Sequence, residues 1–284
     1  MPRADVDGLS IAYESLGDRG RPWILTPGGR YSKDYGGVRE LAAAIAAHGN
    51  RVVVWDRPNC GESEVCFRGA SESEMQADVL VGLVRALDLG PTVLIGGSGG
   101  ARVSMLAAAR QRDVASGVGV WWISGGVFGL LSLASYYCAP AVPAVWNGGM
   151  DAVADIPSWK EVFERNPRNL EILRAQDRHE FIATMERWME AYCSCSGELI
   201  PGLPDDEAAS FDLPAIVFRS GASDYNHPRE TSEQVAALLG NAELVEPPWP
   251  DTEWIDRAKG TWREFERWPL LAPQLVEWAE AKLG

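Results

Sequence analysis

The sequence contains little cysteine and little histidine. Its 284 residues include five cysteines and three histidines, with no CxxC pair and no HExxH motif. An odd number of cysteines without paired spacing excludes a disulfide framework and favours a reducing compartment. Cys193 and Cys195 lie close together, but no accompanying ligand pattern predicts a metal site, and we expect two partly buried thiols.

Positive charge is also scarce. Lys and Arg total 26 against 40 Asp and Glu, which gives a net charge of -14. Such an acidic surface repels phosphate backbones and anionic lipid headgroups, so we expect neither nucleic acid nor a membrane as a partner. The first residues, MPRADVD, contain acidic groups and no apolar segment, which predicts that no secretion signal is present and that the protein is cytoplasmic.

One long segment, residues 114–150, lacks charge altogether. It is long enough to span a membrane. However, glycines and serines interrupt it, and Lys or Arg do not flank its apolar part on both sides. We therefore expect a buried strand that leads into an apolar pocket wall.

Short apolar runs alternate with amphipathic segments along most of the chain, which is typical of a parallel α/β sheet. Residues 127–210 break this alternation and are expected to form helices only. We predict a mostly parallel α/β sheet with helices on both faces, a core domain of residues 1–126 and 211–284, and an inserted helical cap of residues 127–210. The expected strands are 23–25, 51–55, 92–95, 118–123, 215–218 and 243–245, and the expected helices are 35–48, 73–88, 99–112, 128–137, 159–164, 168–192, 229–239 and 270–282.

The segment Gly96-Gly97-Ser98-Gly99-Gly100 follows an expected strand and begins an expected helix. A GxSxG pattern in this context predicts a nucleophile elbow, in which a sharp turn exposes the serine hydroxyl and the glycines let strand and helix approach. The turn Thr26-Pro27-Gly28-Gly29 follows the strand expected beside it. The N–H groups of Gly29 and Gly99 are candidates for an oxyanion hole, although a simple chain reversal would also explain the first turn.

These motifs together resemble the capped members of the α/β-hydrolase superfamily, over nearly the whole chain. The matching segments are TPGG, the loop DRPNCGES, the elbow GGSGG, the helical cap, and FRSGASD ending at Asp224. The resemblance implies that Asp224 orients a catalytic histidine. We interpret DRPNCGES as a loop with a structural role.

The sequence departs from the superfamily at the histidine, which family members carry after the last strand. Residues 243–254 contain none. We predict Ser98 as nucleophile and His227 as general base, because histidine is the side chain suited to proton transfer near neutral pH. The acid is Asp224 or Asp251, with Asp224 favoured. The other two histidines are expected on the surface, His48 at a helix end and His179 on a cap helix, where it could still face the pocket.

The charge-free stretch is rich in aromatic residues, and Trp122 and Tyr137 are our candidates for substrate binding. We predict a cofactor-independent serine hydrolase that acts on a small apolar or aromatic ester, lactone or activated carbon–carbon bond. The alternative is a ligand-binding, signalling or lyase protein on the same fold, since the usual histidine is missing. The oligomeric state stays open.

Overall fold

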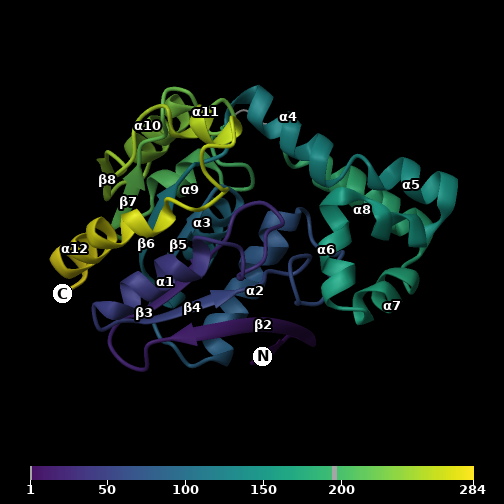
Figure 1. Cartoon of the computed structure of the whole chain (residues 1–284), viewed down its shortest axis with the longest axis horizontal. Coiled ribbons are helices and arrows are strands. Elements are labelled where there is room, and N and C mark those ends of the chain that lie inside the picture. Colours follow the sequence, from purple (N-terminus) through teal and green to yellow (C-terminus); the bar gives the residue numbers. More distant parts are fainter. Residues whose placement is uncertain (1, 194–196) are drawn as a thin grey trace.

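The computed structural model describes residues 2–193 and 197–284. At its centre lies an eight-stranded sheet in the order β1-β2-β4-β3-β5-β6-β7-β8 (Figure 1). β1 and β2 are antiparallel to their neighbours, and the strands from β4 to β8 are all parallel. The strands are β1 Arg3–Val6, β2 Leu9–Leu16, β3 Pro22–Thr26, β4 Arg51–Trp55, β5 Thr92–Gly97, β6 Ala115–Trp121, β7 Ala215–Phe218 and β8 Ala242–Val245.

Helices cover both faces of this sheet, as the sequence predicted. The central strands are buried on both faces, which explains their continuous apolar runs. α1 and α12 pack on one face, while α2 and α3 pack on the other. The core helices are α1 Val38–Ala47, α2 Glu72–Ala86, α3 Gly99–Arg110, α10 Arg229–Leu238, α11 Glu253–Ala258 and α12 Ala272–Leu283.

The described residues between β6 and β7 form six α-helices. In Figure 1, α5 to α8 form a group beside the sheet, and α4 leads from the core to that group. The last of the six, α9, lies beside the core helix α10. These helices are α4 Gly126–Tyr137, α5 Ala141–Gly148, α6 Pro157–Arg165, α7 Arg168–Arg174, α8 Arg178–Glu190 and α9 Asp205–Ala209.

The prediction of one helix over residues 168–192 is wrong, because the chain breaks between α7 and α8. Asp177 causes the new start: its side chain accepts hydrogen bonds from the N–H groups of His179 and Glu180. An aspartate in this position satisfies helix N–H groups that would otherwise lack partners.

The charge-free run behaves only in part as expected. Its first portion is the buried strand β6, but the following segment Gly126–Gly148 is only 28% buried over its most apolar window. By length and composition alone this segment could cross a membrane. The expected buried strand is confirmed as β6, and beyond it Leu133 and Tyr137 line a cavity, while several other large side chains are exposed: Val127, Phe128, Leu131, Tyr136 and Trp146.

Cys60, Cys66 and Cys138 are buried free thiols. Cys193 is exposed, which corrects the expectation of a partly buried thiol, and Cys195 lies outside the described residues. Within the described ranges, no group of three or more His, Cys, Asp or Glu side chains is placed to hold a metal ion.

Candidate active site

Ser98 occupies the turn between β5 and α3, in a backbone conformation that L-residues rarely adopt (φ 56°, ψ -122°). Such a conformation costs on the order of 1–3 kcal/mol and persists only where the surroundings hold it. The neighbouring glycines allow it. A Cβ atom on Gly100 would lie 2.1 Å from the carbonyl oxygen of Thr26, and one on Gly96 would lie 2.6 Å from the backbone of Gly100. The elbow is therefore built as the motif predicted.

His227 and Asp224 lie beside this serine. The Nε2 atom of His227 is 2.9 Å from Ser98 Oγ, and its Nδ1 atom is 2.9 Å from Asp224 Oδ2. The other carboxylate oxygen, Oδ1, accepts hydrogen bonds from the backbone N–H groups of His227 (2.9 Å) and Asn226 (3.1 Å). Histidine and aspartate are both at least 95% buried. The three side chains thus form a serine–histidine–aspartate relay, with acid and base on a single loop after β7.

The remaining candidates lie elsewhere. His48 is exposed at the end of α1, and His179 is exposed on α8, where its ring contacts Trp146. Asp251 does not contact His227. It forms an ion pair with Arg229, and its backbone carbonyl accepts a hydrogen bond from Ser223 Oγ (2.8 Å). Of the two predicted acids, the structure brings Asp224 to the histidine.

The two predicted oxyanion-hole glycines border the same cavity as Ser98. Gly99 is the first residue of α3, so its N–H has no partner within the helix, and the helix N-terminus carries partial positive charge. A Cβ atom on Gly99 would lie 3.6 Å from the Gly29 nitrogen, so the two backbones are close. Arg57 Nη2 donates to the carbonyl oxygens of Gly28 (3.1 Å) and Gly29, which holds the loop in place.

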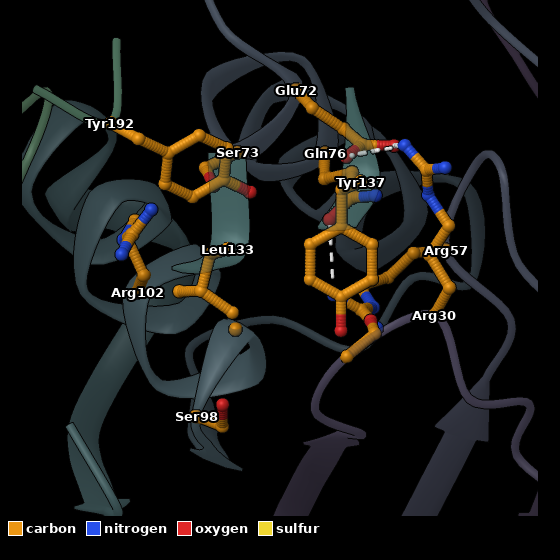
Figure 2. Close-up of a pocket in the computed structure, with 12 residues that line it drawn as sticks. Arg30, Arg57, Glu72, Ser73, Gln76, Ser98, Arg102, Leu133, Tyr137 and Tyr192 are labelled. Carbon is orange, nitrogen blue, oxygen red and sulfur yellow. Dashed lines mark hydrogen bonds and ion pairs between the residues drawn. The ribbon is translucent and has the colours of Figure 1, made fainter. Parts of the chain in front are cut away.

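The cavity above Ser98 contains more charged residues than the sequence predicted. It contains about 380 Å³ of empty space, part of which opens to solvent. Figure 2 shows Ser98 at one end, with both charged side chains and the rings of Tyr137 and Tyr192 around the rest. Only three large apolar or aromatic side chains line it, and the full lining is Gly29, Arg30, Arg57, Glu72, Ser73, Gln76, Ser98, Gly99, Arg102, Leu133, Tyr137 and Tyr192. The lining therefore combines apolar and charged side chains, and it includes Tyr137, one of the two predicted substrate-binding residues.

Trp122, the other predicted substrate-binding residue, does not line this cavity. It is 3% exposed and stacks on the His227 ring at a centroid distance of 5.9 Å. Trp254 contacts the same ring edge-on at 4.8 Å. Trp122 therefore packs behind the histidine and fixes its orientation, which corrects its assignment. The sequence could not distinguish a tryptophan in the pocket from one behind it.

Two carboxyl groups lie near this relay. Burial, together with the charge of Asp224, raises the pKa of Glu253 to about 7, although Arg257 opposes the shift. Burial also raises the pKa of Glu264, and Arg257 and His227 oppose it. Arg257 forms an ion pair with Glu264 and lies 3.9 Å from the centre of the Trp254 ring. The relay therefore packs against a buried aromatic and charged layer.

The helices α4 and α6 contact the loop that follows β3, at the border of the cavity. The guanidinium of Arg30 lies 3.5 Å from the ring centre of Trp159 in α6, and 5.2 Å from that of Tyr137 in α4. Arg165, also in α6, donates a hydrogen bond to Ser32 (2.7 Å) and pairs with Asp34. These contacts hold the cap helices over the elbow.

Sequence reasoning missed the charged residues of the cavity. Arg57 belongs to the DRPNCGES loop, whose structural interpretation holds for Asp56: this buried carboxylate accepts hydrogen bonds from the N–H groups of Lys33 (2.6 Å) and Glu62 (2.9 Å). Arg30 directly follows TPGG, and Arg102 lies in the otherwise small and apolar first turn of α3. The positive charges of Arg30 and Arg102, each beside a predicted site motif, were the signal in the sequence that could have indicated a charged cavity.

No family model matches the sequence, and no curated protein matches it. Solved structures match nearly the whole chain. The enol-lactonase from Burkholderia xenovorans LB400 is 23% identical, with a TM-score of 0.59 over 98% of this chain and 100% of that chain. A thermophilic esterase from Thermogutta terrifontis is 20% identical, with a TM-score of 0.60 over 100% of this chain and 99% of that chain. An alpha/beta hydrolase from Sphaerobacter thermophilus DSM 20745 is 21% identical, with a TM-score of 0.61 over 98% and 99%.

Proposed function

We propose that this chain, which has the α/β-hydrolase fold, is a cofactor-independent serine hydrolase that cleaves an ester, a lactone or an activated carbon–carbon bond. The observation that carries the proposal is the 2.9 Å contact between Ser98 Oγ and His227 Nε2, with Asp224 on the opposite side of the ring. The similar structures, a lactonase and an esterase by name, support the reaction class.

In the proposed reaction, His227 Nε2 takes the proton of Ser98 as the hydroxyl oxygen attacks the substrate carbonyl. Asp224 accepts the Nδ1–H hydrogen bond, which selects the required tautomer and stabilises the imidazolium. The N–H groups of Gly29 and Gly99 would bind the oxyanion. His227 then gives its proton to the leaving group, and water hydrolyses the acyl-enzyme by the same steps in reverse.

The alternative of a binding protein or lyase rested on the absence of histidine after the last strand. His227 fills that role from the loop after β7, so the contact with Ser98 favours hydrolysis. A cytoplasmic location and a small-molecule partner remain proposals from composition.

Covalent labelling tests this function. A fluorophosphonate probe should modify the wild-type chain, and mass mapping should place the label on Ser98. Ser98→Ala should lose both the label and the hydrolysis of p-nitrophenyl acetate with nearly unchanged thermal stability. Ser104→Ala is the matched control, because Ser104 is a fully buried serine on α3, the helix that Ser98 precedes. A label on Ser124, 3.4 Å from Ser98 Oγ, or full activity in Ser98→Ala would contradict the proposal.

A further inference from the structure

The cavity above Ser98 has a local charge opposite in sign to that of the whole chain. Its lining contains three arginines and one glutamate, whereas the chain carries a net charge of -14. Burial raises the pKa of the Tyr137 and Tyr192 hydroxyl groups, so both stay neutral. Glu72 is therefore the one anion among the lining residues.

Glu72 compensates only one of the three arginines. Arg30 Nη2 lies 3.0 and 3.1 Å from its two carboxylate oxygens, and Asn59 Nδ2 donates to the same carboxylate at 2.9 Å. Arg57 has neutral partners instead: the carbonyls of Gly28 and Gly29, and Gln76 Oε1 at 3.1 Å. The positive charges of Arg57 and Arg102 remain without a carboxylate partner among the described residues.

Arg102 is the more unusual of the two. It is 5% exposed, and in the described part of the chain its Nη2 atom has no hydrogen-bond partner. Its guanidinium lies 5.0 Å from the ring centre of Tyr192. Burial lowers its pKa, and a hydrogen bond with the neutral Tyr192 side chain opposes that shift. Arg102 therefore has a neutral partner but no counter-charge, and proteins generally provide a counter-charge for a buried ion.

The position of Arg102 relative to the nucleophile suits a substrate group. Ser98 is the residue that precedes α3, and the backbone N–H of Arg102 donates a hydrogen bond to the Ser98 carbonyl oxygen (3.3 Å), so the two residues are one helical turn apart. Both line the cavity, and Figure 2 shows Arg102 beside Tyr192 on one wall, with Arg30 and Arg57 across from it in this view. A guanidinium binds a carboxylate through two parallel N–H groups.

We propose that Arg102 binds a carboxylate of the substrate, so that the enzyme acts on acidic esters or lactones rather than neutral ones. Arg57, whose Nη1 atom would lie 3.4 Å from a Cβ atom on Gly99, adds positive charge near the reacting carbonyl. This inference rests on the proposed hydrolase function for the reaction, but carboxylate binding itself does not depend on turnover.

Two five-carbon acyl esters test it. Mono-p-nitrophenyl glutarate carries a terminal carboxylate, and p-nitrophenyl valerate has the same chain length without one. The wild type should hydrolyse the glutarate ester with the higher kcat/KM. Arg102→Gln should lose about 10- to 100-fold in kcat/KM on that ester, the range for a charge-assisted hydrogen bond, and change less than about threefold on the valerate. Arg110→Gln, a more exposed arginine of the same helix that pairs with Glu74, should change neither.

Equal losses on both esters in Arg102→Gln would assign the residue a packing role and overturn the inference, as would a wild-type preference for valerate. Binding separates the inference from the proposed function. Glutarate should raise the melting temperature of the Ser98→Ala protein, and the additional change Arg102→Gln should remove that shift. If hydrolysis fails but this binding persists, the carboxylate site stands and the hydrolase proposal falls. If glutarate does not bind, the carboxylate site is wrong.

Discussion

The substitution Asp224→Asn tests the relay most directly, because the structure fixes how the new amide must lie. Asp224 Oδ1 accepts two backbone N–H groups, from Asn226 and His227. An asparagine oxygen can replace it there, whereas its NH₂ group cannot accept these bonds. The NH₂ group then faces His227 Nδ1, at the position where Oδ2 lies 2.9 Å away.

This arrangement favours the wrong tautomer, because the NH₂ group takes the closer of the two contacts that Asp224 makes with Nδ1, 2.9 Å at Oδ2 against 3.1 Å at Oδ1. An NH₂ group facing Nδ1 makes that nitrogen the acceptor, so the ring proton moves to Nε2, the atom that faces Ser98 Oγ. A protonated Nε2 cannot take the serine proton. In a serine–histidine–aspartate triad this change lowers kcat about 10⁴-fold, equivalent to about 5.4 kcal/mol at about 1.36 kcal/mol per factor of ten. KM should change little, since Asp224 does not line the substrate cavity.

The assay is steady-state hydrolysis of p-nitrophenyl acetate by purified variants, with kcat and KM separated. Asp251→Asn is the matched control, because this carboxylate is 59% exposed and its ion pair with Arg229 lies away from the histidine. An exposed pair contributes about 0–1 kcal/mol to folding stability, so Asp251→Asn should stay folded. Its kcat should stay within about fivefold of the wild type, because the carboxylate does not contact the histidine. A larger loss in Asp251→Asn than in Asp224→Asn would refute the assignment of the acid.

Three further changes follow from the structure. His227→Ala should lose about 10³-fold or more in kcat because no base remains, whereas the exposed His48→Ala should be unchanged; a crippling effect of His179→Ala would move the base to the cap. Glu253 has a pKa of about 7 in the fold and an ordinary value near 4.5, so between these two pH values the folded chain keeps a proton that the unfolded chain loses, and stability falls as pH rises from about 4.5 to 7. Glu253→Gln should lessen this decline in melting temperature, whereas the exposed Glu280→Gln should not. An unchanged profile in Glu253→Gln would contradict the burial argument. Gly100→Ala places a Cβ atom 2.1 Å from the Thr26 carbonyl oxygen and should lower the free energy of unfolding by about 1–3 kcal/mol in urea titrations. Gly36→Ala is the control, because its Cβ atom meets no atom within 4 Å. Equal stabilities of the two variants would argue against the tight elbow.

The strand and helix order from β3 to α3 follows from hydrophobic periodicity, because buried parallel strands and amphipathic helices have distinct patterns. The hairpin of β1 and β2 was missed, although Asp7 and Gly8 (φ 51° and 79°) form the two-residue turn that an Asp-Gly pair favours. The break before α8 was missed because helix periodicity continues across it, and only the capping hydrogen bonds of Asp177 reveal it.

The candidate site was predictable where a motif encodes it locally. Ser98 belongs to such a motif, and Asp224 and His227 share one loop. The cavity was not predictable, since Arg30, Arg57 and Arg102 come from three different segments that only the fold brings together. The aromatic count of the charge-free stretch was misleading for the same reason: Trp122 is near the site in space, but behind the histidine.

The placement of acid and base on one loop also affects how the site assembles as the chain folds. Closing the three-residue separation between Asp224 and His227 restricts few backbone bonds, so this contact costs little chain entropy. The contact between Ser98 and His227 spans 129 residues and forms only when β5, β6 and β7 are in register. Recovery of esterase activity during refolding should therefore report the docking of these three strands.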